Sequence, residues 1–401
     1  MPTFFAGLRG TGSFGTDERP KEFREMILWM QPNGNAPLFA LTSKARTETL
    51  SDPEFAWWEE TQTICRVLVN NGAGYNDAAT TLTVDGMDAR ELIPGDLLMV
   101  EPTTEVAAYS GEVLRVASVT NGTTIVVTRG AAGTTAAALV DNQALLRIGN
   151  AQGEGTLSIT SSSTNPTKFN NYVQIFKTPY QLSKTAMATK FRTGDPLKNE
   201  QKRKSFQHAE KIEQALFWGQ ASETTVTQDG ESRILRTTKG IRSFITTNNF
   251  VYGAPPSLDE LADDLAPLFD YDAGSAGNER IAFCGNTALM HLARQARDAV
   301  TVNFNEKATF YGMEFKRLEL PQGTIYVKSH PLLNVHPVYK KSMFVMPGSG
   351  IIYRPLKGRD THIEKDIQAN DADYKKDQWL TECGFEFHHE QTWGYYGNVG
   401  A

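Results

Sequence analysis

The sequence has few cysteines, and it lacks long apolar runs. Its three cysteines, Cys65, Cys284 and Cys383, lie far apart in 401 residues and show no CxxC spacing. We therefore expect free, buried thiols in a reducing compartment rather than a disulfide framework. No window approaches the length of a membrane-spanning helix, and the first residues lack the basic and apolar regions of a secretory signal. These absences predict a soluble cytoplasmic protein that makes no membrane contact.

Catalytic signatures are also missing. The sequence contains no GxSxG and no GxxxxGK[ST], and Ser110 and Ser349 stand in predicted turns without a histidine or acid that the sequence places beside them. Neighbouring carboxylates such as Asp263 and Asp264 are better explained as solvated charge. We therefore predict no catalytic residue and no enzyme activity.

Two further patterns contain the residues of known sites but lack the secondary structure or geometry that those sites need. GTGSFG contains Gly10, Gly12 and Gly15 at dinucleotide-binding spacing, but no strand precedes it and no helix follows it, which favours a flexible arm. We therefore predict no cofactor. His388, His389 and Glu390 are potential metal ligands, but adjacent residues of a strand point to opposite faces, so we predict no metal site. His330 and His336 flank a connection with a proline and are predicted to be surface or edge residues.

The chain also lacks an excess of positive charge. The chain has 46 acidic and 40 basic residues, a net charge of -6, which argues against a protein that coats nucleic acid. The run KNEQKRK, residues 198–204, could form a phosphate-binding face. A solvated helix face with internal ion pairs, such as Glu200 with Lys204, is the preferred interpretation. Any contact with DNA should be local and non-specific.

One long helix is the clearest positive signal. Asp195 can cap it, Pro196 suits its first turn and Gly219 offers a left-handed stop, which predicts a helix over 196–218. Its apolar positions recur every three or four residues, at Phe206, Ala209, Ile212 and Leu216. At about 1.5 Å per residue the helix would be about 35 Å long.

A long stretch rich in Gly, Ala, Thr and Val precedes this helix, from Cys65 to Gly155. Short apolar or alternating runs are separated there by turn signals, at Asp85-Gly86, Pro94-Gly95 and Asn121-Gly122. This texture predicts an inserted all-β domain, either a compact barrel or a sandwich. The residues on either side, DPEFAWWEE and VQIFKTPYQLSKTA, are strand-like and are expected to close a long hairpin across the insertion.

The rest of the chain mixes helices and strands without a regular βαβ alternation, which predicts an α+β fold. Residues 1–34 are Gly-rich with one short helix in KEFREMILWM, and they predict an arm with little core of its own. Residues 221–240 are predicted to be a polar loop. Ser257 and Asn286 are predicted to cap two helices, and the last hundred residues are largely strand-like.

Taken together, the segment order resembles the major capsid protein of tailed bacteriophages, with the Hong Kong 97-type capsid fold and a β-domain inserted in its extended loop. The segments that carry the resemblance are APLFALTS, DPEFAWWEE, NNYVQIFKTPYQLSKTA, ALFWG, RTTKGIRSFITTNN and WLTECGFEFHHEQTWGYYGNV. The resemblance implies the following division of the chain: an N-terminal arm at 1–34, an extended loop at 35–64 and 156–194, the inserted domain at 65–155, a peripheral domain with a spine helix at 195–239 and 368–401, and an axial domain at 240–367.

By the same resemblance, the chain would self-assemble through hexamers and pentamers into the icosahedral head shell that encloses a packaged double-stranded DNA genome. Expected partners are portal, scaffolding and decoration proteins, with assembly in the host cytoplasm and residence in the virion. Some family members crosslink lysine to asparagine; Lys168, Lys177 and Lys184 lie near the expected loop, but the sequence shows no matching partner motif, so no crosslink is inferred. An alternative is a tail, spike or decoration protein whose inserted domain binds a glycan or receptor, and another is a hydrolase with an unrecognised site.

Overall fold

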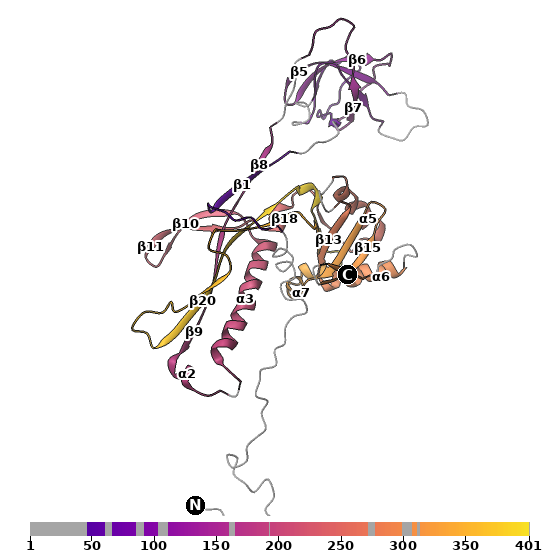
Figure 1. Ribbon diagram of the computed structural model, residues 1–401. Coiled ribbons are helices and arrows are strands. Elements are labelled where there is room, and N and C mark those ends of the chain that lie inside the picture. The colour runs from indigo at the N-terminus through magenta and orange to yellow at the C-terminus, as the bar shows by residue number, and fades with distance from the viewer. Residues whose placement is uncertain are drawn as a thin grey trace, which may run out of the picture. The chain divides into compact units, whose positions relative to one another are not determined.

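The computed structural model describes residues 46–60, 66–85, 92–102, 111–159, 165–191, 193–271, 277–298, 307–310 and 313–400. They form two compact units (Figure 1): the body, which ends at Trp57 and resumes at Asn170, and the inserted unit, Trp58–Phe169. The chain passes between them through β1 (Glu54–Glu59) and β8 (Thr167–Tyr172), which pair with each other. The predicted arm at 1–34 with its short helix, the glycine pattern within it, Cys65 and Ser110 lie outside the described residues.

The long helix is α3 (Pro196–Trp218), and it has the predicted bounds. The carboxylate of Asp195 caps it by accepting hydrogen bonds from the backbone N–H groups of Leu197 and Lys198. The predicted left-handed stop is wrong, because Gly219 has a φ of -56°. Glycine is needed there for another reason: an added Cβ would lie 2.4 Å from the carbonyl oxygen of Thr238. The end of the helix is thus defined by a close approach of two backbone segments.

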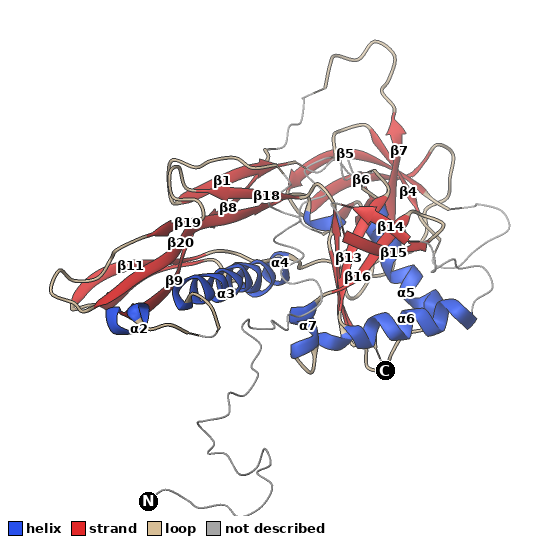
Figure 2. Ribbon diagram, turned by 60° about the horizontal axis from the view of Figure 1, so that its bottom comes forward, coloured by secondary structure: helices blue, strands red, loops and turns tan. Residues whose placement is uncertain are grey.

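Beside α3 lies a four-stranded sheet built on one long strand (Figure 2). β20 (Tyr374–Phe387) pairs antiparallel with β9 (Gln174–Ser183) along one edge, and with β18 (Ile351–Pro355) and β19 (His362–Glu364) along the other. Alternate residues of β9 are buried, so that one face of the strand meets the helix. The predicted hairpin is therefore corrected: β8, not β9, pairs with β1, because β9 is taken up by a partner about 200 residues further along the chain.

The body also contains a mixed seven-stranded sheet in the order β12-β21-β17-β13-β16-β15-β14, with β13 parallel to β16 and β12 parallel to β21. Its strands are β12 (Asn249–Val251), β13 (Glu279–Cys284), β14 (Lys307–Phe310), β15 (Met313–Glu319), β16 (Thr324–Ser329), β17 (Met343–Pro347) and β21 (Gly394–Gly397). Helices α5 (Leu258–Leu265) and α6 (Asn286–Asp298) share one apolar core with this sheet. A second core joins other residues of the sheet to α3 and the four-stranded sheet. The seven-stranded sheet is therefore packed on both faces.

The smaller elements of the body connect these layers. They are α2 (Lys184–Ala188), β10 (Ser222–Gln228), β11 (Glu231–Thr237), α4 (Ile241–Phe244), α7 (Pro331–Val335) and the 3-10 turns η3 (Ala266–Phe269), η5 (Tyr339–Lys341) and η6 (Glu390–Thr392). Ser257 caps α5 as predicted, since its hydroxyl accepts from the Glu260 N–H. Asn286 is instead the first residue of α6, and its side-chain oxygen accepts a hydrogen bond from Ser329.

The inserted unit is an antiparallel sheet that closes on itself. Its strands, in the order β2-β7-β4-β5-β6-β3, are β2 (Arg66–Leu68), β3 (Thr81–Thr83), β4 (Asp96–Val100), β5 (Val113–Asn121), β6 (Thr124–Ala131) and β7 (Ala144–Asn150). The two outer strands meet through a bridge between Val69 and Val84, with the Asn70 N–H donating to the Thr83 carbonyl. Thirteen buried apolar residues of the described segments fill the interior. Of the two predicted arrangements, barrel or sandwich, the structure has the barrel.

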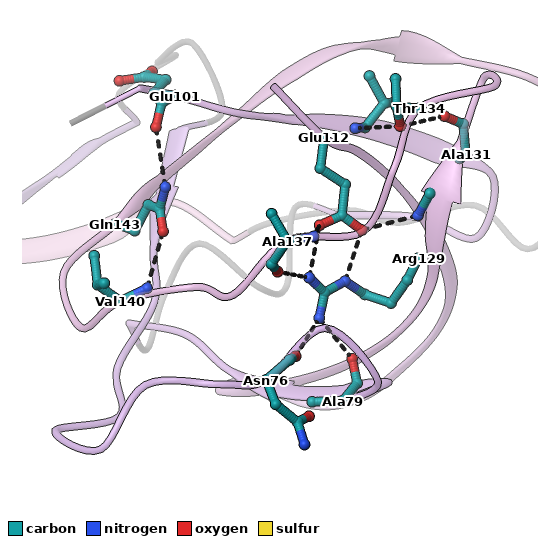
Figure 3. Close-up of polar contacts among 12 residues, drawn as sticks. Asn76, Ala79, Glu101, Glu112, Arg129, Ala131, Thr134, Ala137, Val140 and Gln143 are labelled. Carbon is teal, nitrogen blue, oxygen red and sulfur yellow. Dashed lines mark hydrogen bonds and ion pairs between the residues drawn. The ribbon is translucent and has the colours of Figure 1, made fainter. Parts of the chain in front are cut away.

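A buried ion pair joins the loops of this barrel to its strands (Figure 3). Arg129 lies 2.6 Å from Glu112, and their side chains are 7% and 0% exposed. Arg129 also donates to the carbonyls of Asn76 and Ala79, while Glu112 accepts from the backbone N–H of Ala137. Burial alone would raise the pKa of Glu112, but the hydrogen bonds from Arg129 and the backbone lower it below its ordinary value.

The α+β prediction is confirmed by this mixture of sheets and helices. The predicted division between 367 and 368, however, does not follow the strand pairing: β18 and β19 precede it yet pair with β20, and β21 follows it yet pairs with β12 and β17. Sequence order alone cannot show which strands pair across such distances. The compact unit at 58–169 is also wider than the predicted 65–155, and the finer division of the chain stays a prediction.

Candidate assembly surfaces

Polar residues on the buried face of α3 fix the helix to the sheet beside it. His208 is 2% exposed and lies between two threonine hydroxyls, 3.0 Å from Thr178 and 2.8 Å from Thr381. Lys211 donates to Thr178, so the Thr178 hydroxyl can donate in turn to Nδ1 of His208. This arrangement needs a neutral imidazole, and burial, helped by the charge of Lys211, lowers the pKa of His208 to about 4.

A second buried contact links α3 to the seven-stranded sheet. His330, at the end of β16, is 0% exposed, and its Nε2 lies 2.8 Å from Oε1 of Glu213. The Nδ1 atom of His330 accepts the Leu332 N–H at the start of α7, so Nε2 carries the proton that is donated to Glu213. The prediction that His330 lies at the surface or an edge is wrong. His208 and Glu213 were missed because each interrupts the apolar pattern of α3, and only their position on the buried helix face would have revealed them.

The exposed face of α3 contains short-range ion pairs. Arg203 lies 2.6 Å from Glu200, and Lys204 donates to Gln207. Internal pairing on a solvated face was predicted, but the partner of Glu200 is Arg203, three residues away, rather than Lys204. Positions three and four residues apart are both neighbours on a helix surface, so spacing alone did not decide between them.

The segment after α3, predicted to be a polar loop, is a regular hairpin of β10 and β11. The turn residues Asp229 and Gly230 have φ of 55° and 80°, the conformation of a two-residue hairpin turn. None of the residues in its two strands is buried, and among the described strands β10 and β11 pair only with each other. A lone two-stranded hairpin is marginal in water, so this hairpin needs a covering surface.

The base of this hairpin forms an apolar pocket with the start of β9, which we call the β9–β11 socket. Its volume is about 140 Å³, and Pro53, Val173, Gln174, Ile175, Ile234, Leu235, Arg236, Thr237 and Glu382 line it. Three of these apolar side chains remain exposed: Ile175 at 54%, Ile234 at 57% and Leu235 at 47%. Such a group of exposed aliphatic residues is typical of a surface that another chain covers.

At the other end of β9, α2 and the connection that follows it carry one more exposed apolar residue each. Met187 is 41% exposed and Phe191 is 42% exposed. Within β9 itself, Pro179 cannot donate a backbone hydrogen bond, which blunts the free edge of the strand against pairing with another strand. Contacts at this sheet must therefore come mainly from side chains.

The residues weighed as metal ligands do not come together. His388 contacts Glu386 at 2.6 Å, His389 has a left-handed φ of 58°, and Glu390 accepts the backbone N–H groups of Thr246 and Thr247. In the described ranges no group of three or more His, Cys, Asp or Glu side chains is placed to hold a metal.

The other candidate residues lie in different parts of the chain. Cys284 and Cys383 are buried free thiols, and burial raises the pKa of Cys284 to about 12. Lys177 lies in β9, Lys184 begins α2 and Lys168 lies in β8. Ser349 lies in the turn between β17 and β18. The structure gives these residues no shared site.

Comparison with known proteins explains why open surfaces, rather than a catalytic centre, stand out. A sequence model of the SU10 major capsid protein family matches residues 9–400, almost the whole chain. The chain belongs to the SU10 major capsid protein family. The prediction of a major capsid protein, the subunit of a tailed-phage head shell, is thereby confirmed, and the protein is a component of the virion.

A curated relative and several solved structures are similar to this family member. The major capsid protein of Pseudomonas phage PaMx41 is 27% identical over 368 residues, covering 90% of this chain and 84% of that protein. A chain of Mycobacterium phage Bobi has a TM-score of 0.49 at 7% identity, covering 98% of this chain and all of that one. A native GTA particle capsid has a TM-score of 0.48 at 7% identity, covering 97% and 98%.

Members of this family are structural proteins of the capsid, which agrees with the exposed apolar residues on the body. The described part of this capsid protein contains the long helix and the mixture of sheets and helices that the Hong Kong 97-type fold implies. None of its described helices is long and apolar enough to cross a membrane.

Proposed function

We propose that copies of this capsid protein assemble in the host cytoplasm by covering one another's open surfaces in the body, while the inserted unit needs no neighbour to be stable. The observation that supports this most is the β10–β11 hairpin, which has no buried residue of its own. Shell subunits need large contact areas made of individually ordinary patches, and thin, exposed elements provide them.

The parts of the chain would divide this work. Residues 1–34 would lie across a neighbour as an arm, and the segments 35–64 and 156–194 would form the extended loop that contains the inserted domain. α3 would be the spine of the peripheral region. The division into a peripheral domain at 195–239 and 368–401 and an axial domain at 240–367 belongs to the same proposal.

Other partners follow from the needs of a phage head. The shell would be organised into hexamers and pentamers, with a portal protein, a scaffolding protein and possible sites for decoration proteins. Packaged double-stranded DNA would lie near the shell without sequence-specific contacts, since the chain has a net charge of -6 and no excess of basic residues.

The test is assembly of the purified full chain, alone and with its scaffolding protein, followed by sedimentation velocity and negative-stain electron microscopy. Shells, sheets, hexamers or pentamers are the expected outcome. A matched control replaces Ile234 and Leu235 with threonine, which keeps strand propensity but removes exposed aliphatic surface, and it should assemble only at higher concentration. A wild-type chain that stays monomeric at high concentration under every condition contradicts the proposal.

A further inference from the structure

The β9–β11 socket and the two exposed residues Met187 and Phe191 lie at opposite ends of β9. Ile175 is the second residue of this strand, and Met187 and Phe191 follow its last residue, Ser183. Eight residues of extended chain separate Ile175 from Ser183, which corresponds to about 26 Å. In this copy Phe191 thus lies beyond the end of β9 that is far from the socket, so a Phe191 side chain that fills a socket comes from a second copy.

The socket has the size and chemistry of a site for one aromatic ring. Its volume of about 140 Å³ is close to that of cavities that hold a benzene molecule, about 150 Å³. Of the charged side chains that line it, Arg236 pairs with Glu223 and Glu382 pairs with Arg359. The socket therefore offers an aliphatic surface, and Arg236 and Glu382 are already paired within the same copy.

Charge at the two ends is complementary. Asp52 and Glu54 are exposed on either side of Pro53, a socket residue. Lys190 is exposed directly before Phe191. A lysine at the rim of a socket flanked by two carboxylates favours one orientation of docking and speeds association.

We propose that Phe191 of one copy inserts into the β9–β11 socket of a second copy, with Lys190 beside Asp52 and Glu54. The contact is heterologous, because two different patches meet, and such contacts generate rings when the rotation closes. It covers the exposed apolar residues at both ends of β9 and supports the base of the β10–β11 hairpin. The inference depends on the proposed self-assembly and names the residues that carry one of its contacts.

The first test is a short bismaleimide crosslink between cysteines placed at the charged rim of the contact, with Phe191 and the aliphatic lining of the socket unchanged. Full-length Lys190→Cys and Asp52→Cys copies, in a Cys65→Ser background, are mixed, assembled and treated with the reagent. A crosslinked dimer is expected from this mixture, and a ladder of oligomers from the double variant. The control pairs Lys190→Cys with Met290→Cys, since Met290 is 55% exposed on α6. Equal crosslinking in the control, or none in assembled particles, overturns the inference while leaving self-assembly intact.

The second test compares Phe191→Ala with Phe191→Leu. The alanine variant should raise the concentration needed for assembly at least tenfold without changing the thermal unfolding of the unassembled chain, and leucine should restore most of the loss. Assembly of Phe191→Ala at the wild-type concentration contradicts the contact. Capture of a different virion protein by Lys190→Cys, in place of a second copy, contradicts it as well. Failure of the wild-type chain to assemble would instead refute the proposed function itself.

Discussion

The inserted unit and the body differ in how the edge strands of their sheets are paired. In the inserted unit the sheet closes through the Val69–Val84 bridge, and each named strand has a neighbour on both sides among the described residues. Among the described strands of the body, β9 has one strand partner and the β10–β11 hairpin pairs only with itself. Closure removes the edges that promote association, whereas open edges and exposed aliphatic residues invite it. The difference indicates which unit is self-sufficient and which depends on other copies.

Charge separates the two units as well. Of the chain's 46 acidic and 40 basic residues, 12 acidic and 6 basic ones lie in the inserted unit between Trp58 and Phe169, so the whole net charge of -6 belongs to that unit. The body is neutral. Like-charged inserted units repel one another, which keeps them from adding unwanted contacts, while a neutral body associates without that penalty.

The largest expected effect on stability is in the inserted unit. Replacing Arg129 with methionine leaves Glu112 buried without its cation, which should cost about 3–5 kcal/mol of unfolding free energy. Because the inserted unit has its own core, calorimetry should show a lower melting transition for that unit and an unchanged one for the body. The matched control is Arg66→Met in the exposed Arg66–Glu101 pair, which should cost under about 1 kcal/mol. Loss of both transitions together would show that the two units fold cooperatively.

A pH effect should arise in the body at His208. Since the pKa of His208 is lowered to about 4, the unfolded chain takes up a proton between its ordinary pKa of about 6.5 and pH 4 while the folded chain does not. Unfolding free energy should therefore be constant above pH 6.5 and fall by up to about 3 kcal/mol as the pH drops to 4. Chemical denaturation across this range, compared with His208→Gln, measures the effect. An equal slope in the glutamine variant would assign the pH dependence to other groups.

The smallest expected effect on stability is at the hairpin. Val226→Thr in β10 changes a half-buried side chain in strands that contain no buried residue, so unfolding free energy should change by less than about 0.5 kcal/mol. The comparison is sharpened by a core substitution in the other unit, Val116→Thr, whose side chain is 0% exposed and whose new hydroxyl would be buried. A large loss from Val226→Thr would mean that the hairpin is stabilised within a single copy.

Local signals in the sequence predicted local structure well. Asp195, Pro196 and the apolar spacing gave α3 its bounds, because a helix depends on residues within a few positions of one another. The β10–β11 hairpin was missed although Asp229-Gly230 is a strong turn signal. The strands on either side of the turn are mostly polar, so they lack the apolar alternation that usually indicates a strand. The pairing of β9 with β20, and the burial of His330 against Glu213, depend on residues 117 or more positions apart and leave no local trace.

Membership of a capsid family could also be predicted from the sequence. It depended on the order of segments along the chain, and the family match over residues 9–400 confirms it. The contact surfaces could not be predicted, because exposure of Ile175, Ile234 and Leu235 is a property of the folded chain. In a sequence, an exposed isoleucine and a buried one are identical.

The pairing of β1 with β8 has a practical consequence. Since the inserted unit begins and ends in two strands that are hydrogen-bonded to each other, its entry and exit points are held side by side. Any compact module whose own two ends are close together meets the same geometric condition. Exchange at this position would place one foreign module on every subunit of a particle, which makes the β1–β8 pair a natural attachment point for multivalent display.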